Sequence, residues 1–240
     1  RYEDLANELA TLDPSETSAD MNYIVSLPLP PEHRDSPGAG AGAVPFGRGA
    51  LESLGISGDN SSLGQGIKVA VLDSGVQDHD VFAGKVIREF DYVLDANGNP
   101  VPIDVDNGHG TAVASIIAGS DSRLPGVAPA AELLSYRILD NDGYTNSFTL
   151  AEAIVSAADA GADIINVSLG SDGDSNLVRQ AVDYANSKGA LIVAATGNDG
   201  LNHVTYPAAI DGVIAVSAID ARGEHLDFAN SGIGLEAGGM

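Results

Sequence analysis

The stretch that decides the fold is residues 67–75, Ile-Lys-Val-Ala-Val-Leu-Asp-Ser-Gly. Its apolar run is bounded by Gly66 and Asp73 and has the length of a strand buried on both faces. Similar runs cover residues 132–139, 163–169, 190–196 and 213–218, and helical stretches lie between strands at residues 109–119, 147–160 and 174–187. Continuous apolar strands that alternate with helices predict an α/β fold, a doubly wound and mostly parallel sheet with helices on both faces.

Polar residues follow strands of this predicted sheet or begin one of its helices. Asp73 comes directly after the first strand and Asn198 comes just past the run 190–196, where open parallel sheets gather their functional groups. His109 lies between two glycines at the start of a predicted helix, and a histidine is the natural general base near neutral pH. An asparagine amide is a suitable donor to a developing oxyanion. A turn aspartate or a solvated histidine is the simpler alternative for each residue taken singly.

Eight ordered segments resemble those of the subtilisin-like serine proteases, the subtilase family. The resemblance covers roughly residues 66–235, and its segments are VAVLDSG (69–75), NGHGT (107–111), GVAP (126–129), INVSLG (165–170), AATGN (194–198), YPA (206–208), VIAV (213–216) and FANSG (228–232).

The resemblance implies a role for each matching residue. It makes Asp73 the carboxylate of a catalytic triad, His109 the general base and Asn198 the oxyanion donor. It also implies two edge strands that flank the substrate peptide, formed by Gly143 and Tyr144 and by Ser168, Leu169 and Gly170. An extended peptide binds such edges by adding a strand.

The catalytic serine of the family is expected outside this chain. It lies in a Gly-Thr-Ser-x-Ala motif some tens of residues after the segment matched by residues 228–232, and the sequence stops before that motif. The expected function is a serine endopeptidase that hydrolyses peptide bonds through an Asp/His/Ser triad and an acyl-enzyme. The alternative is a catalytically inactive fragment or pseudo-protease that binds peptides or complements a second chain. The expected partners are a polypeptide substrate and either the chain's own prodomain or a C-terminal fragment that carries the serine.

Two domains are expected. Residues 59–240 match a catalytic core that lacks its C-terminal part, whereas residues 1–58 have no counterpart in it and are interpreted as an N-terminal extension, either a prodomain remnant or a wrapping arm. Residues 1–12 carry leucines at helical spacing. Residues 23–45 contain five prolines and predict an extended arm, and a short helix is expected at residues 47–54.

The charge of the chain excludes several classes of function. Thirty-four acidic and 11 basic side chains give a formal net charge of −23, which argues against nucleic-acid binding and against docking on an anionic membrane. Residues 76–80 after the first strand are partly acidic and form no glycine-rich phosphate loop, which disfavours a nucleotide-binding protein. The absence of cysteine excludes disulfides and thiolate sites. The charge also favours basic or neutral substrates.

No cofactor is required by the expected chemistry, and no metal ligand is assigned. Calcium is the alternative, with Asp78 and Asp80 as candidates, although surface carboxylates are the default in an acidic protein. An EF-hand starting at Asp104 fails because its twelfth position is Ser115. A secreted location is expected from the resemblance, with an intracellular one as the alternative.

Overall fold

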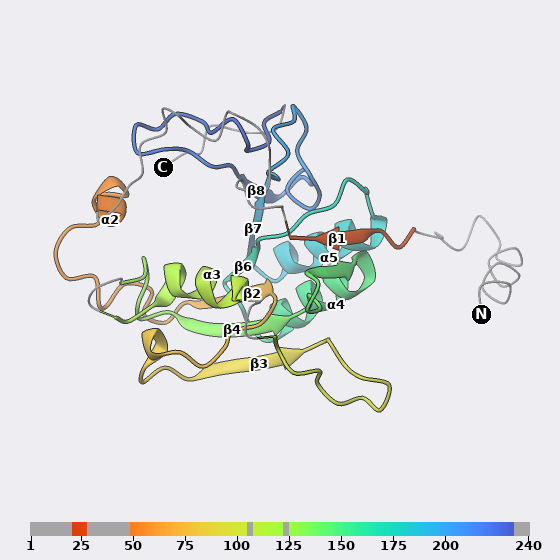
Figure 1. Ribbon diagram of the computed structural model, residues 1–240, viewed down its shortest axis with the longest axis horizontal. Coiled ribbons are helices and arrows are strands. Elements are labelled where there is room, and N and C mark those ends of the chain that lie inside the picture. Colours follow the sequence, from red (N-terminus) through yellow and green to blue (C-terminus); the bar gives the residue numbers. More distant parts are fainter. Residues whose placement is uncertain (1–20, 28–48, 105–107, 122–124, 233–240) are drawn as a thin grey trace, which may run out of the picture.

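A six-stranded parallel sheet forms the centre of the computed structural model, which describes residues 21–27, 49–104, 108–121 and 125–232 (Figure 1). The strand order is β3-β4-β2-β6-β7-β8, and every neighbouring pair is parallel. The strands are β2 (Lys68–Asp73), β3 (Ile87–Asp91), β4 (Glu132–Arg137), β6 (Ile164–Val167), β7 (Leu191–Ala195) and β8 (Val213–Val216). The five strands predicted from apolar runs are therefore present, and β3 is an additional edge strand.

Helices cover both faces of this sheet, as the sequence predicted. They are α3 (His109–Ala118), α4 (Ser147–Asp159) and α5 (Asn176–Ser187). The short α2 (Ala50–Ser53) buries no residue, whereas the 3₁₀ helix η3 (Asp80–Phe82) packs Val81 and Phe82 into the core beside α3. Side chains of β2 alternate between the faces: Val69 and Val71 pack in one cluster with α3, whereas Ala70 and Leu72 pack in the other with α4 and α5. This period of two is what a strand buried on both faces requires.

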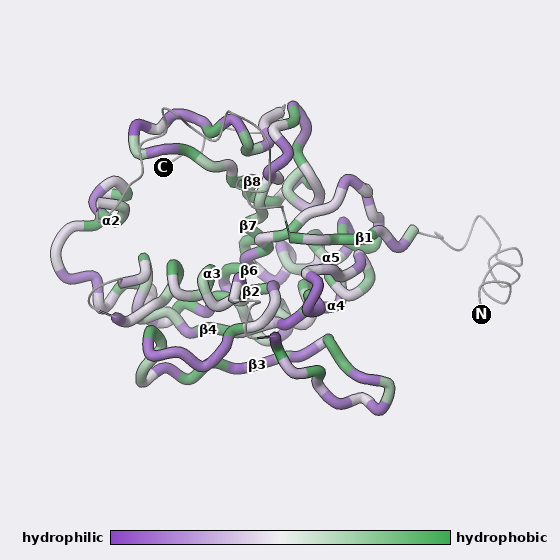
Figure 2. Tube along the Cα trace, in the orientation of Figure 1, coloured by the Kyte–Doolittle hydropathy of each residue, from purple (hydrophilic) through white to green (hydrophobic). Residues whose placement is uncertain are grey.

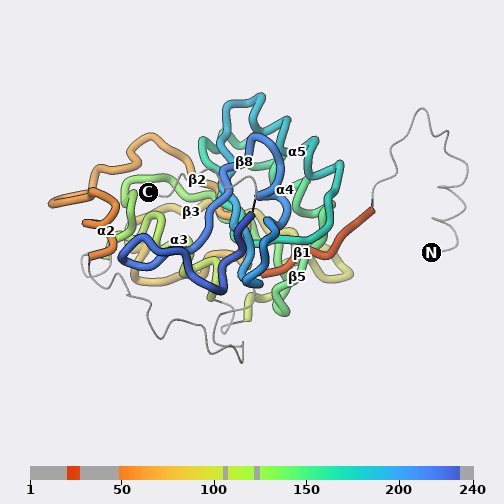
Figure 3. Tube along the Cα trace, turned by 90° about the horizontal axis from the view of Figure 1, so that it is seen from above, coloured from red at the N-terminus to blue at the C-terminus, as the bar shows by residue number. Residues whose placement is uncertain are grey.

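Two short strands form a separate antiparallel pair at the side of the α4 and α5 layer. They are β1 (Ile24–Ser26) and β5 (Tyr144–Asn146), which lie side by side in Figure 3. Asn146 also caps α4, because its side-chain oxygen accepts the N–H of Thr149 at 3.1 Å. The cap fixes the direction in which β5 leads into the helix.

The edge strand β3 differs from the central strands in composition. It is drawn largely as hydrophilic in Figure 2, and its residues are half-buried or exposed.

None of the helices in the described ranges is long and apolar enough to cross a membrane. The leucines of residues 1–12 and most of the proline-rich arm lie outside the described residues, whereas the short helix expected at 47–54 is present as α2.

Candidate active site

Asp73 and His109 form a direct side-chain pair at the carboxyl edge of the sheet. Asp73 ends β2 and its side chain is 1% exposed, whereas His109 begins α3 and its side chain is 40% exposed. Nδ1 of His109 lies 2.8 and 2.9 Å from the two carboxylate oxygens. An ionised carboxylate only accepts hydrogen bonds, so Nδ1 carries the proton and Nε2 is the basic nitrogen of the neutral ring.

The pKa of His109 is raised above its ordinary value of 6.5. The hydrogen bond to Asp73 is the largest cause, partial burial of the ring opposes it, and the negative charge of Asp73 adds to it. The carboxylate therefore stabilises the imidazolium. A histidine held in this way has one fixed tautomer and a protonated form that is ready to give its proton back.

Small residues allow α3 to begin close to the end of β2. A Cβ atom on Gly110 would lie 2.4 Å from the carbonyl oxygen of Gly75 and 3.1 Å from Cβ of Asp73. Gly75 has a φ of +93°, which side chains rarely adopt. Ser74 Oγ accepts the N–H of Gly110 at 3.1 Å. These contacts hold the turn after β2 against the first turn of α3, and so fix the two members of the pair.

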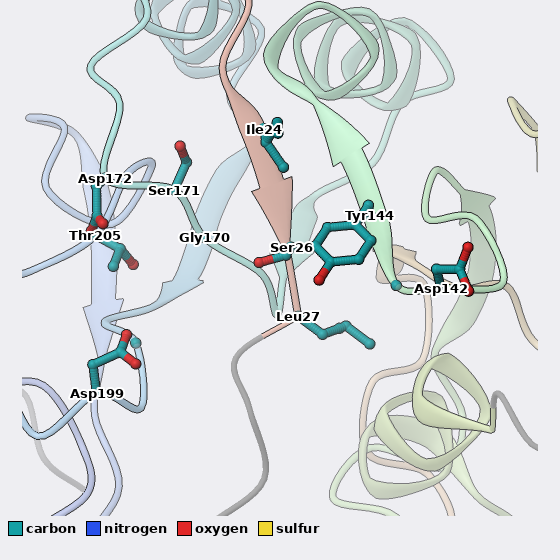
Figure 4. Close-up of a pocket in the computed structure, with 12 residues that line it drawn as sticks. Ile24, Ser26, Leu27, Asp142, Tyr144, Gly170, Ser171, Asp172, Asp199 and Thr205 are labelled. Atoms are coloured by element: carbon teal, nitrogen blue, oxygen red, sulfur yellow. The ribbon is translucent and has the colours of Figure 1, made fainter.

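A cleft of about 430 Å³ opens at the same edge of the sheet (Figure 4). One wall follows the loop before β5, and the other follows the segments after β6 and β7. The residues that line it are Ile24, Ser26, Leu27, Asp142, Gly143, Tyr144, Gly170, Ser171, Asp172, Gly197, Asp199 and Thr205. The two walls present backbone edges, which can each pair with an extended chain.

Strand β1 runs between these two walls, antiparallel to both (Figure 4). Ser26 and Gly170 exchange both backbone hydrogen bonds at 3.0 Å, and the N–H of Leu27 donates to the carbonyl of Gly143 at 3.2 Å. On the β5 side, Val25 pairs with Thr145. Segment 24–27 therefore occupies the groove between these two backbone edges in the manner of an added strand, and Ile24, Ser26 and Leu27 form one side of the remaining open space of about 430 Å³.

Side chains on both sides of β1 anchor the segment. Val25 is 1% exposed and belongs to the main core, whereas Ile24 is 72% exposed. The ring of Tyr23 packs on Gly173, where an added Cβ would lie 2.1 Å from the ring. Tyr23 and Ser147 are also joined by backbone and side-chain hydrogen bonds, at 2.9 and 3.1 Å. The sequence interpretation of an extended arm covered this segment, but its place in the cleft depends on pairing with residues more than 100 positions away.

Asn198 lies between two residues that line the cleft. It follows β7, and Gly197 and Asp199 on either side of it both face the cleft. Its side chain is partly exposed and makes no hydrogen bond within the described ranges. Since β2 and β7 are separated only by β6, the ends of these strands lie about 10 Å apart at the usual strand spacing.

The other predicted substrate-binding residues occupy different positions. Gly143, Tyr144 and Gly170 line the cleft. Leu169 is fully buried in the core, and the Ser168 hydroxyl accepts a hydrogen bond from Asn166 at 2.9 Å. Asp172, Asp199 and Thr205 also line the cleft, and their places in it were not predicted. The two aspartates lie two residues beyond the strand-end glycines Gly170 and Gly197, so proximity to those glycines was the available signal.

The candidate calcium ligands do not form a metal site. Asp78 and Asp80 are both exposed, and residues 21–27, 49–104, 108–121 and 125–232 contain no cluster of three or more His, Cys, Asp or Glu side chains that could hold a metal ion. Two exposed carboxylates fall short of the six to eight oxygens that calcium takes.

Comparison with known proteins places this chain and its fold in one family. Residues 64–238 match the subtilase family of peptidases. The chain is 40% identical over 171 residues to a thermophilic serine proteinase of Bacillus sp. (strain AK1), covering 70% of this chain and 42% of that protein. It is 38% identical over 173 residues to thermitase of Thermoactinomyces vulgaris, covering 70% and 61%. A solved mutant form of the protease domain of PatA is 34% identical with a TM-score of 0.66, covering 72% of this chain and 66% of that one.

A parallel α/β sheet with helices on both faces is the fold of a subtilisin-like protease. The chain belongs to the subtilase family, so the resemblance found in the sequence is confirmed. Its relatives are serine proteases, and hydrolase and protease are the activity class of the family. The chain spans 42% of the first of these proteinases and 61% of the second.

Proposed function

We propose that residues 1–240 supply the base, its carboxylate and the peptide groove of a serine endopeptidase. The observation that carries the proposal is the His109–Asp73 pair, at 2.8 Å, at the same edge of the sheet as a groove in which an extended strand is paired. A protease needs both parts, because the base must act on a peptide bond that is held in a fixed register. We infer endopeptidase activity through an acyl-enzyme because a general base and a groove that can hold a peptide lie at the same edge of the sheet.

The mechanism assigns one task to each residue. Nε2 of His109 takes the hydroxyl proton of the serine as its Oγ attacks the carbonyl carbon of the substrate, and Asp73 stabilises the imidazolium formed. The amide of Asn198 donates to the oxyanion of the tetrahedral intermediate. The imidazolium then protonates the leaving amine, which gives an acyl-enzyme. Water attacks the ester by the same route, with His109 again accepting and returning the proton.

The serine comes from a segment outside residues 1–240, because this sequence contains no Gly-Thr-Ser-x-Ala motif. A C-terminal segment or a second chain that carries the motif is therefore the proposed partner of this part of the core. The alternative function is an inactive fragment or pseudo-protease, which would keep the groove and bind peptides without cleaving them.

A fluorophosphonate probe separates these two functions. Incubation of the full-length protein with the probe should label a species heavier than 24.4 kDa, as intact mass spectrometry will show. His109→Ala should abolish labelling because the serine loses its base, whereas His225→Ala should leave it unchanged because His225 bonds Ser217 and not Asp73. A full-length protein that binds peptide but takes no label under any condition would establish the inactive alternative.

We also propose that the resident occupant of the groove is the chain's own N-terminal extension. This extension covers residues 1–58 and ends just before the family match begins at residue 64. Gly173→Ala tests it, since the new Cβ would collide with the ring of Tyr23 and loosen β1. The amides of Ser26 and Leu27 should then exchange hydrogen faster, while the control Gly49→Ala, with open space around its Cβ, should leave their exchange unchanged. Equal exchange in both variants would contradict the proposal.

Carboxylates along the groove favour basic or neutral substrates. Asp142, Asp172 and Asp199 line it, and His203 lies 3.4 Å from Asp172. Negative charge around a groove concentrates cationic peptides and repels acidic ones. Of two labelled peptides that differ only in having a lysine or a glutamate, the lysine peptide should therefore bind the chain more tightly at low salt. Equal affinities would remove this preference.

A secreted location is proposed, and an intracellular one is the alternative. The proposal follows from membership of the subtilase family. Fractionation of the producing cells followed by detection of the protein in medium or lysate decides between the two.

A further inference from the structure

We infer that Asn230 is a positioning residue that fixes the segment around Asn198 and so sets the oxyanion donor in place. The inference rests on the role proposed above for Asn198. Asn230 is fully buried, and it lies 32 positions further along the chain, in a segment without regular secondary structure. Its hydrogen bonds reach the residues on both sides of Asn198.

The side-chain oxygen of Asn230 holds the segment after Asn198. Oδ1 accepts the backbone N–H of Asp199 at 2.7 Å and that of Leu201 at 3.1 Å. Neighbouring residues add two backbone bonds, from Gly200 to the carbonyl of Phe228 at 2.7 Å and from Ser231 to the carbonyl of Leu201 at 2.9 Å. A loop that would otherwise leave several amides unpaired is therefore bonded to one short stretch.

The backbone of Asn230 holds the segment before Asn198. Its N–H donates to the carbonyl of Gly197 at 2.8 Å, and its carbonyl accepts the hydroxyl of Thr196 at 3.0 Å. Nδ2 packs on Gly197, whose φ is +105° and where an added Cβ would lie 2.5 Å from that nitrogen. The glycine thus allows a close approach that no other residue permits.

Asn198 itself depends on these contacts for its position. Its side chain has no hydrogen bond within the described ranges, and the bonds that Asn230 makes to residues 196, 197, 199 and 201 hold the backbone from which that side chain projects. Nδ2 of Asn230 is buried and has no partner in this part of the structure. A buried amide with an unpartnered N–H is costly, and the two bonds accepted by its oxygen explain why the residue is an amide and not an aliphatic side chain.

Hydrogen exchange of the chain as it stands gives the first test. In Asn230→Ala, the amides of Asp199 and Leu201 should exchange at least about tenfold faster because their acceptor is gone. Amides of β7 should keep their rates, which shows that the sheet is intact. Asn230→Asp should restore protection, since an aspartyl oxygen accepts in either protonation state. Ser231→Ala is the matched control, because Ser231 bonds the carbonyl of Leu201 through its backbone N–H, which the substitution keeps. Unchanged exchange of Asp199 and Leu201 in Asn230→Ala would overturn the inference.

Kinetics of the full-length protease give the second test. Removal of an oxyanion donor costs about 10²–10³ in kcat, so loss of its support should lower kcat about 10- to 100-fold with KM within about twofold. In an Asn198→Ala background, Asn230→Ala should have no further effect on kcat. An equal loss in both backgrounds would show a purely structural role and refute the inference. Absence of activity in the unmodified full-length protein would count against the proposed function alone, because hydrogen exchange still tests whether Asn230 holds the segment around Asn198.

Discussion

Replacement of Val25 by alanine should loosen β1 from the cleft and strengthen binding of a free peptide there. Val25 is the side chain of β1 that is buried in the core, at 1% exposure, whereas Ile24 beside it is 72% exposed. The substitution removes two buried carbon groups, worth about 0.8 kcal/mol each, and leaves a small cavity. The backbone hydrogen bonds to Gly170 and Gly143 remain. The docked segment should therefore lose about 1.5–2.5 kcal/mol.

The loss in docking free energy of β1 sets the expected change in peptide affinity. If β1 is paired with the two backbone edges of the groove most of the time, a free peptide binds only the small fraction of molecules in which these edges are open, and its apparent Kd is the intrinsic Kd divided by that fraction. A loss of about 1.5–2.5 kcal/mol raises the open fraction roughly 10- to 70-fold, because about 1.4 kcal/mol corresponds to tenfold. The apparent Kd should fall by the same factor until most molecules are open.

Fluorescence anisotropy with a labelled peptide of residues 22–27 measures this change. Ile24→Ala is the matched control and should shift the apparent Kd by no more than about twofold, since exposed substitutions rarely exceed 0.5 kcal/mol. Urea unfolding of both variants checks that the sheet remains folded. An unchanged Kd for Val25→Ala, or equal shifts for both variants, would refute the view that β1 competes with peptides for the cleft.

Two further predictions concern the carboxylate–imidazole pair. Asp73→Asn should lower the pKa of His109, because the hydrogen bond and the charge that raise this pKa are lost while the burial that lowers it remains. NMR titration of His109 measures the change. The control Glu152→Gln removes an exposed charge elsewhere and should not reproduce the shift. Since the pKa of His109 is raised in the folded state, the His109–Asp73 pair stabilises the protein below about pH 6.5 and loses this contribution as the pH rises through the raised pKa. Activity of the full-length protein should increase over the same pH range, because the general base becomes neutral. Gly110→Ala should cost about 1–3 kcal/mol in urea unfolding through its 2.4 Å clash, whereas Gly108→Ala, which meets nothing within 4 Å, should cost less than 1 kcal/mol; equal costs would contradict the close-approach argument.

The central sheet was predictable from the sequence because its strands are continuous apolar runs: β2 and β4 are almost fully buried, and even the edge strand β8, where Ile214 and Val216 are exposed, has four apolar residues. Five apolar runs bounded by glycine or aspartate gave strands within about two residues of those observed. The edge strand β3 was not predicted, since Ile87–Asp91 contains three charged residues among its five and is only half-buried. Strand β1 has three residues and stands before a proline-rich stretch, and its conformation is set by pairing across the cleft.

Within the candidate site, only residues at a strand end or a helix start could be predicted from the sequence. Asp73 and His109 were identified from their positions at a strand end and a helix start, and the family segments assigned their roles. Asn230 carried no such signal, because its bonds go to residues 196–201 and local sequence says nothing about partners some 30 positions away. Membership in the subtilase family confirms the fold, whereas the assigned roles of the individual residues stay predictions.

Because β1 and the cleft belong to one polypeptide, filling of the cleft does not depend on how dilute the protein is. Tethered ligands reach effective concentrations on the order of millimolar. A separate peptide of the same sequence would dissociate on dilution to nanomolar levels, but the covalently linked strand would not. Dilution alone would therefore never empty this groove. Only a competing peptide, a cut in the connecting chain or local unfolding of residues 21–27 would expose the edges of Gly143 and Gly170 to a substrate.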